Sequence, residues 1–370
     1  MILAKKVRIR PTPEQEQQLW RSAGTARWVY NLTLARQIEN YQNGGKFLHD
    51  GVLRKELTQL KQREEYAWLY DVSNNVAKQA VKDACDAYKK MFKGQSKKPK
   101  FKIKKRSKPA FYNDTVKFKV KDSKVLLEKI GWVATSEQLP ESDKYSNPRV
   151  SFDGKYWYVS VGIEQEQESP ELSDEAIGID VGIKELAVCS NGMVFKNINK
   201  TAVVRKTEKR LRRLQRKVSR KYEMNKEGSR FVKTCNIVKV ENSIRLLHRR
   251  ITNIRGNHIH QATNAIAKTK PSAVVMEDLN VKGMMKNRYL SKAIAGQKLH
   301  EFTRQMKYKC EKIGARFIQA DRWFSSSKLC SCCGRIKKDL KLSDRTYECD
   351  CGFIIDRDMN AAINLSKLAN

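Results

Sequence analysis

Four cysteines near the C-terminus constrain the fold of this chain more than any other feature. They form two short pairs, CSCCG at residues 330–334 and CDCG at residues 349–352. The spacing is close to that of a zinc ribbon, although the second pair is one residue shorter than usual. A glycine after each pair allows a tight backbone turn, which favours Cys333 over Cys332 as a ligand. We therefore expect one structural zinc ion with a closed coordination shell, bound by Cys330, Cys333, Cys349 and Cys351.

Two acidic residues lie in apolar stretches, where a charge is costly unless it is paired or binds a metal. Asp180 lies in AIGIDVGIKELAV, which we interpret as one buried strand beginning at Ala176. Alternation places Asp180 on the face of Gly178 and Gly182, and we expect these glycines to leave space for a phosphate. Glu277 follows an apolar stretch and is interpreted in the same way. The alternative for such an acid is that it caps a helix or faces water.

A third acid lies at the start of the last helix, which we expect from about residue 358. Asp356 is nearer to the N-cap position, whereas Asp358 shares a helical face with Leu365. Either could be the third acid, and either could simply stabilise the helix N-terminus. Three carboxylates on adjacent elements could hold two divalent cations, which activate a water and stabilise the leaving oxygen of a phosphodiester. This pattern predicts a metal-dependent nuclease.

The chain is strongly basic, with 75 Lys and Arg against 40 Asp and Glu in 370 residues and a net charge of +35. Such an excess predicts a polyanionic partner and salt-sensitive binding. Tryptophan and tyrosine are interleaved with the basic runs, which favours nucleic-acid binding over a merely solvated basic surface.

Other classes of protein are disfavoured. The chain contains no apolar stretch of about 18 residues, so we expect no membrane span. Its first residues lack the apolar core of a signal peptide, and the odd number of nine cysteines argues against a disulfide framework. We therefore expect a cytoplasmic protein. The absence of a glycine-rich phosphate loop argues against an NTPase or helicase.

The pattern of the first half predicts a β-domain that is interrupted by helices. A strand at 2–10 with one basic face precedes three or four helices, which begin at Thr12-Pro13 and end near Phe92. A basic linker at 93–108 follows, and then strand-like segments up to Ile163, including residues 115–120. The acidic stretch 164–175 suggests a domain boundary.

The second half is expected to form an α/β domain around the acids. Its expected elements after the first strand are a return strand at 193–195, helices at about 201–222 and 237–269, a strand at 272–279, a helix at 296–313 and a strand at 315–320. The first of these helices is intensely basic, with a narrow apolar stripe.

In combination, the motifs GIDVGIKELAV, VVMEDLNV, SSSKLCSCCG with ECDCG, and DRDMNAAINL resemble TnpB. TnpB proteins are transposon-encoded RNA-guided nucleases related to the compact type V CRISPR effectors. The N-terminal stretches KKVRIRPTPEQEQQLW and RWVYNLTLA are similar to the same family, so the resemblance covers nearly the whole chain.

The resemblance implies an α+β multidomain fold. It implies an oligonucleotide-binding-like β-barrel (the wedge domain) with an inserted helical bundle, followed by an RNase H-like RuvC domain with a zinc-ribbon insertion. The corresponding ranges are 1–10 and 94–170 for the wedge, 11–93 for the helical recognition domain, 171–326 and 353–370 for RuvC, and 327–352 for the zinc finger.

The resemblance also implies the function. It implies cleavage of target DNA beside a short motif, with Asp180, Glu277 and Asp358 as catalytic ligands of two Mg²⁺ ions and Asp356 as the alternative third acid. The expected partners are a guide RNA from the transposon end and double-stranded DNA, bound by a monomer. By position, Asn75 and Gln79 resemble the residues that read the DNA motif. A nuclease-inactive RNA-guided repressor is the alternative, and a strand-joining transposase is a third reading.

Overall fold

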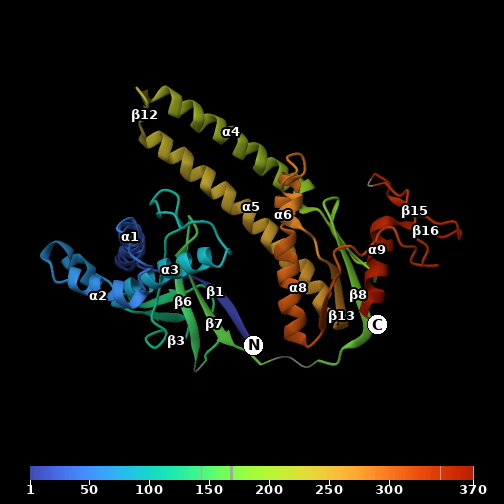
Figure 1. The fold of residues 1–370 in the computed structure, drawn as a ribbon, viewed down its shortest axis with the longest axis horizontal. Coiled ribbons are helices and arrows are strands. Elements are labelled where there is room, and N and C mark those ends of the chain that lie inside the picture. Colours follow the sequence, from blue (N-terminus) through green and yellow to red (C-terminus); the bar gives the residue numbers. More distant parts are fainter. Residues whose placement is uncertain (143, 167–169, 342, 370) are drawn as a thin grey trace. The chain divides into compact units, whose positions relative to one another are not determined.

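The computed structural model describes residues 1–142, 144–166, 170–341 and 343–369. The chain divides into two compact units, residues 1–165 and 166–370, which are described separately (Figure 1). Residues 167–169 of the expected acidic linker lie outside the described part. Among the described helices, none is long and apolar enough to cross a membrane.

The first unit is built on a seven-stranded antiparallel sheet. Its strand order is β2-β6-β7-β1-β5-β4-β3, so the N-terminal strand lies in the middle of the sheet. The strands are β1 (Ile2–Arg10), β2 (Ala110–Tyr112), β3 (Lys119–Lys121), β4 (Lys124–Leu127), β5 (Gly131–Thr135), β6 (Tyr145–Phe152) and β7 (Trp157–Glu164). Strand β1 pairs with β7 and β5, which the alternation of apolar and basic residues allows because one face of β1 is buried.

The helices of this unit are inserted between β1 and β2. They are α1 (Pro13–Gln42), α2 (Asp50–Leu60), a 3₁₀ helix (Glu64–Asp71) and α3 (Asn74–Phe92). Thr12 and Gln15 form a reciprocal capping box at the start of α1, with Pro13 in the first turn. The helices and the sheet share one hydrophobic core, in which Leu19 and Val81 belong to the same cluster as Val159.

One expected strand of this unit is wrong in part. Residues 115–117 form a turn, and only Lys119–Lys121 is extended. The side chain of Asp114 accepts hydrogen bonds from the backbone N–H groups of Val116 and Lys117, at 2.9 and 3.2 Å. This local side-chain-to-backbone bonding offers the chain an alternative to a strand ladder, which the alternating pattern does not reveal.

The second unit contains a mixed five-stranded sheet with the order β10-β9-β8-β13-β14. Strands β8 (Ser173–Val181), β9 (Glu185–Cys189) and β10 (Val194–Lys196) are antiparallel, while β13 (Pro271–Glu277) and β14 (Arg316–Ala320) run parallel to β8. The expectation of one strand in AIGIDVGIKELAV is wrong, because the chain reverses at residues 182–184. Both strands are buried in the sheet, so the apolar run continues across the reversal and hides it.

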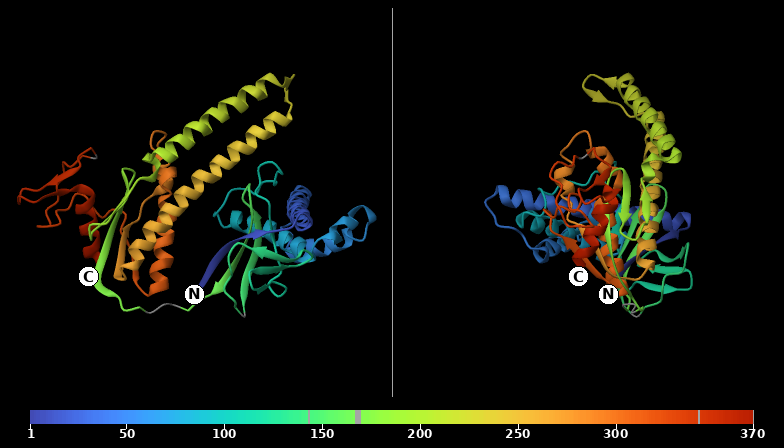
Figure 2. Two further views of the ribbon diagram at one scale, coloured as in Figure 1. Left: turned by 180° about the vertical axis from the view of Figure 1, so that it is seen from behind. Right: turned by 90° about the vertical axis from the view of Figure 1, so that its right-hand side faces the viewer.

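Helices cover the two faces of this sheet (Figure 2). Helices α5 (Cys235–Lys268) and α8 (Leu299–Ile313) pack on one face, where Ile179 and Met276 meet Ile259 and Phe302. The opposite face, which carries Val275, is covered by α9 (Arg357–Ser366). Because side chains alternate along a strand, Gly178 and Asp180 lie on the α9 face.

The remaining elements of the second unit lie outside the central sheet. Helix α4 (Ala202–Met224) runs antiparallel to α5, with the short strands β11 (Lys226–Glu227) and β12 (Arg230–Phe231) between them (Figure 1). The other elements are α6 (Val281–Met284), α7 (Ser291–Gln297), β15 (Thr346–Glu348), β16 (Ile354–Asp356) and 3₁₀ helices at Ile198–Lys200 and Lys367–Ala369. The expected helix 296–313 is divided at Lys298, whose φ of 53° interrupts the helical backbone.

Candidate active site and cysteine cluster

Asp180 and Glu277 lie side by side at the carboxyl ends of two parallel strands. Met276 of β13 is opposite Ile179 of β8, so Glu277 and Asp180 are the next residues along the two strands. Glu277 comes two residues after Val275, and Asp180 comes two residues after Gly178. Both Val275 and Gly178 face α9. Their carboxylates therefore lie on the same face and at the same edge of the sheet.

Asp358 approaches these two acids from the first turn of α9. Helix α9 packs on β8, and burial together with the nearby carboxylates of Glu277 and Asp358 raises the pKa of Asp180 to about 8. The guanidinium of Arg357 opposes this shift without cancelling it. Three crowded carboxylates form a donor set of oxygens that a divalent cation would stabilise, and the raised pKa of Asp180 reflects this crowding as well as burial.

Asp356 has a different role from Asp358. It is the N-cap of α9, and its Oδ1 accepts hydrogen bonds from the backbone N–H groups of Asp358 and Met359, at 2.9 and 3.1 Å. Its side chain is thus used by the helix terminus. Asp358 is free of that task and is half-buried, and its contribution to the shift at Asp180 is larger than that of Asp356.

The space expected beside Asp180 is not open at Gly178. A Cβ atom at Gly178 would lie 1.9 Å from the carbonyl oxygen of Ala362 and 2.4 Å from the backbone nitrogen of Ser366. The expectation that this glycine leaves space for a phosphate is therefore wrong, because the backbone of α9 fills that space. Gly178 instead allows α9 to approach β8 closely.

Two further side chains hold the acids in place. The hydroxyl of Ser326 donates a short hydrogen bond to Glu277, and Arg357 forms an ion pair of 3.3 Å with Asp358. Sequence reasoning missed both. Ser326 is one of three consecutive serines that nothing in the sequence distinguishes, and Arg357 is one of many basic residues.

The four predicted cysteine ligands come together in the second unit. One sulfur from each of Cys330, Cys333, Cys349 and Cys351 lies within 4.8 Å of the others. The Sγ atoms of Cys330 and Cys351 are 3.8 Å apart, and those of Cys333 and Cys349 are 3.5 Å apart. Tetrahedral zinc with Zn–S bonds of ~2.3 Å places its sulfurs about 3.8 Å apart, so the donor set fits this metal. Cys332 lies outside the cluster.

The local backbone explains this geometry. Gly334 and Gly352 have φ values of 75° and 83°, a conformation that glycine adopts easily and that allows a tight turn after each cysteine pair. The second pair makes its turn although it is one residue shorter than usual. Although burial acts to raise it, hydrogen bonds from the N–H groups of Cys333 and Cys332 lower the pKa of Cys330 to about 7. A thiolate is the form that binds a metal, and the pKa of Cys330 favours it, whereas, against backbone N–H groups that act to lower it, hydrogen bonds among the clustered thiols raise the pKa of Cys349 and Cys351.

Two asparagines connect the cysteine section to the helix of Asp358. Asn360 and Asn364 are fully buried and lie one turn apart on α9. The amide of Asn360 donates to the carbonyl of Leu329 at 2.7 Å, and that of Asn364 donates to the carbonyl of Ser326 at 2.9 Å. Sequence reasoning noted this asparagine-marked run but assigned it no role. Two amides four residues apart on an otherwise apolar face are the signal that could have revealed it.

The residues expected to read DNA lie in the first unit, on α3. The amide of Asn75 donates to Glu128 at 3.2 Å, and the amide of Gln79 donates to Asp83 at 2.9 Å. Each donates through one side-chain N–H, and the side-chain carbonyl oxygen of Gln79 can still accept a hydrogen bond.

The fold and the sites together define a class of proteins. Over 95% of this chain and 82% of the other, the structure matches that of Cas12f1 in the “Cryo-EM structure of the Cas12f1-sgRNA-target DNA complex”, with a TM-score of 0.59 and 15% identity. The chain thus has the α+β multidomain fold of a compact CRISPR effector. Family models match residues 300–365 (Cas12f1-like, TNB domain), 1–46 (helix-turn-helix domain, OrfB_IS605) and 158–288 (OrfB_IS605, “Probable transposase”).

Two curated relatives identify the family. The chain is 31% identical to “Putative RNA-guided DNA endonuclease InsQ” of Escherichia coli (strain K12), over 98% of this chain and 91% of that protein. It is 32% identical to “Putative RNA-guided DNA endonuclease” of Streptomyces pristinaespiralis, over 98% of this chain and 88% of that protein. The chain belongs to the TnpB family of RNA-guided DNA endonucleases.

Proposed function

We propose that this protein is an RNA-guided DNA endonuclease of a transposon, which cuts target DNA beside a short motif. One observation carries the proposal. Three acids that are far apart in the sequence, Asp180, Glu277 and Asp358, interact at one edge of the second unit's sheet. The chain that carries these acids is similar over 98% of its length to a relative named as an RNA-guided DNA endonuclease.

The catalytic ligands in this proposal are Asp180, Glu277 and Asp358. Two Mg²⁺ ions bound to them would supply the positive charge that activates a water and stabilises the leaving oxygen of the phosphodiester. Ser326 holds the carboxylate of Glu277, and Arg357 orients that of Asp358. Asp180 must release its proton to act as a ligand, because its pKa is about 8 in the metal-free protein.

The zinc ion belongs to the same proposal. Cys330, Cys333, Cys349 and Cys351 would bind one structural Zn²⁺, which stabilises the ribbon at 327–352. That ribbon runs through β16 directly into the N-cap of α9. Zinc would therefore fix the entry of the helix that carries Asp358.

The domain assignment is proposed as follows. The seven-stranded sheet supports an oligonucleotide-binding-like wedge at 1–10 and 94–170, and the inserted helices support a recognition domain at 11–93. Three antiparallel strands followed by two parallel ones support an RNase H-like RuvC domain at 171–326 and 353–370. A guide RNA and double-stranded DNA are the partners, bound by one copy of the chain, and Asn75 and Gln79 would contact the DNA motif.

Helix α4 offers a basic surface that could bind nucleic acid. Exposed lysines and arginines follow the outer side of α4, whose apolar stripe is limited to a few residues such as Leu211. Such a surface suits an RNA–DNA heteroduplex, which a protein of this kind recognises by its backbone and shape.

The test is cleavage of a plasmid by the purified protein with its co-purified RNA and Mg²⁺. Asp180→Ala should abolish cleavage and leave RNA and DNA binding intact. Asp174→Ala is the matched control, because Asp174 lies at the exposed start of the same strand. Guide-dependent DNA binding without cleavage by the wild type would favour the nuclease-inactive repressor. Cleavage that persists in Asp180→Ala would contradict the site assignment.

A further inference from the structure

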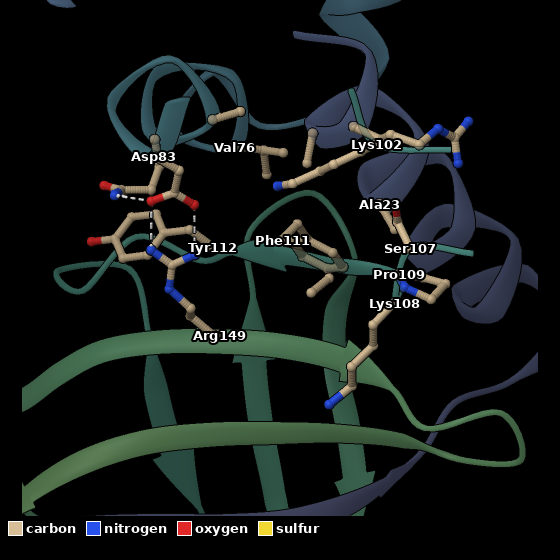
Figure 3. A pocket seen from close by; sticks show the side chains of 15 residues that line it. Ala23, Val76, Asp83, Lys102, Ser107, Lys108, Pro109, Phe111, Tyr112 and Arg149 are labelled. Carbon is tan, nitrogen blue, oxygen red and sulfur yellow. Dashed lines mark hydrogen bonds and ion pairs between the residues drawn. The ribbon is translucent and has the colours of Figure 1, made fainter. Parts of the chain in front are cut away.

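A small basic pocket lies in the first unit between α1, α3 and β2 (Figure 3). Its volume is about 70 Å³, which holds a group the size of a phosphate rather than a whole nucleotide. Four cationic side chains and one acidic side chain line it, namely Arg27, Lys102, Lys108, Arg149 and Asp83. The acid is already neutralised, because Arg149 binds both oxygens of Asp83 at 2.7 and 2.8 Å.

Lys102 is the central group of this pocket. Its backbone is fixed by two hydrogen bonds with the side chain of Asn31, at 2.9 and 2.7 Å. Its ammonium group lies 3.7 Å from the centre of the Tyr30 ring, and Figure 3 shows the side chain extending across the pocket toward Val76. The side chain is half-buried, and this burial lowers its pKa.

The ammonium of Lys102 lacks an anionic partner within ion-pair distance among the residues that the structure describes. Asp83 acts on it only at longer range. Holding a cation in a half-buried position without such a partner costs free energy. The cost is removed if a bound anion supplies the missing charge and hydrogen-bond acceptors.

We propose that this pocket binds one backbone phosphate of the target DNA duplex, with Lys102 as its main contact and Arg27 and Lys108 around it. The inference rests on the proposed function, because it assigns the occupant as DNA beside the sequence motif.

The surroundings favour DNA as the source of the phosphate. Gln79, the residue proposed to contact a base edge, lines both this pocket and a neighbouring groove of about 760 Å³. Lys82 and Lys90 also line that groove, which has room for the adjoining nucleotides. A phosphate held at Lys102 would set the register in which Gln79 meets the bases, because phosphate contacts position a protein and base contacts give specificity.

The test measures how salt weakens DNA binding by the protein with its guide RNA. Binding is measured at several KCl concentrations on two duplexes, one with the cleavage-selected motif and one with that motif scrambled. Lys102→Met should lower the slope of log Kd against log salt by about 0.9 on both duplexes, the value for one lost phosphate contact. Affinity at 0.15 M salt should fall about fivefold, while Lys102→Arg should retain the wild-type slope.

Two controls separate the outcomes. Lys55→Met removes an exposed lysine of α2 that lies outside the pocket and should leave the slope unchanged. Gln79→Ala should reduce discrimination between the duplexes without changing the slope.

A wild-type slope in Lys102→Met, with motif discrimination intact, would overturn the assignment of the pocket as a phosphate site and leave the proposed function standing. A slope change seen with guide RNA instead of DNA would overturn the assignment to DNA. Equal affinity of the wild-type protein for the two duplexes would contradict the proposed function itself.

Discussion

Asn360, fully buried in α9, donates a 2.7 Å hydrogen bond from its side chain to the carbonyl oxygen of Leu329. The same amide accepts a 2.9 Å hydrogen bond from the backbone N–H of Ser331. Leu329 and Ser331 flank Cys330, and Asn360 follows Asp358 by two residues. One side chain thus connects the cysteine cluster to the helix that carries the third acid.

Asn360→Ala should weaken both stability and cleavage. It leaves the N–H of Ser331 without its partner, while the carbonyl of Leu329 keeps the hydrogen bond from Asn364, so the free energy of unfolding should fall by about 1–3 kcal/mol. The rate of DNA cleavage should fall at least tenfold, because α9 loses its fixed position, while guide-RNA affinity stays unchanged. Denaturant titration and single-turnover cleavage measure the two effects. Ser366→Ala is the control, since that hydroxyl donates a hydrogen bond to the carbonyl of Ile363 within α9. Equal rates in both variants would show that the amide does not position Asp358.

Cys330→Ser should reduce zinc content and cleavage together. Removing one of four thiolates weakens the metal site, and the entry of α9 then loses its support. Elemental analysis should find about one zinc per chain in the wild type and much less in the variant. Cys332→Ser is the matched control, because this neighbouring cysteine lies outside the cluster. Full cleavage by a zinc-free variant would indicate that the ribbon serves nucleic-acid contact instead.

The two glycines that flank Asp180 should differ in their tolerance of a methyl group. Gly178→Ala forces the backbone of α9 away from β8, because its Cβ would overlap the carbonyl oxygen of Ala362. We expect a loss of stability of about 1–3 kcal/mol and a cleavage rate at least tenfold lower. Gly182→Ala should be nearly neutral, since its Cβ would lie 3.6 Å from the nearest atom, the carbonyl oxygen of Glu185. Similar rates for the two variants would contradict the close packing of α9.

Asp180 should make stability depend on pH in magnesium-free buffer. Its pKa is raised to about 8, chiefly by burial and then by Glu277 and Asp358, whereas an unfolded chain releases this proton near pH 4. Between these values the folded state binds more protons, so its stability falls as pH rises from about 4 to about 8. Asp180→Asn should remove this loss and be more stable than wild type at pH 8.5, by about 1–3 kcal/mol.

Thermal unfolding across pH measures this difference, which should vanish below pH 4, where both side chains are neutral. Added Mg²⁺ should stabilise the wild type and have little effect on the variant. Identical pH profiles for the two proteins would show that Asp180 is not destabilised by its neighbours.

Local patterns in the sequence predicted much of the fold. The structure confirms the strand at 2–10, the start of α1 after Thr12 and the clustering of the four cysteines. Each depends on residues within one element or one turn, where alternation, capping and tight turns act over a few residues. The reversal at 182–184 escaped prediction because the strands on both sides of it are buried and apolar, so the apolar pattern continues across it. The turn at 115–117 escaped prediction because hydrogen bonds to the Asp114 side chain replace the strand that the alternation indicated.

The sequence by itself determined the candidate site residues: an acid in each of two apolar strands, an acid at the start of the last helix, and two cysteine pairs. Only the tertiary structure decided how they are arranged. It placed Asp358 near Asp180, it filled the space at Gly178 with α9, and it joined the residues on either side of Cys330 to that helix through Asn360. The physical reason is that these outcomes depend on distances between segments more than 100 residues apart, or between a helix and a ribbon that meet only after both have folded.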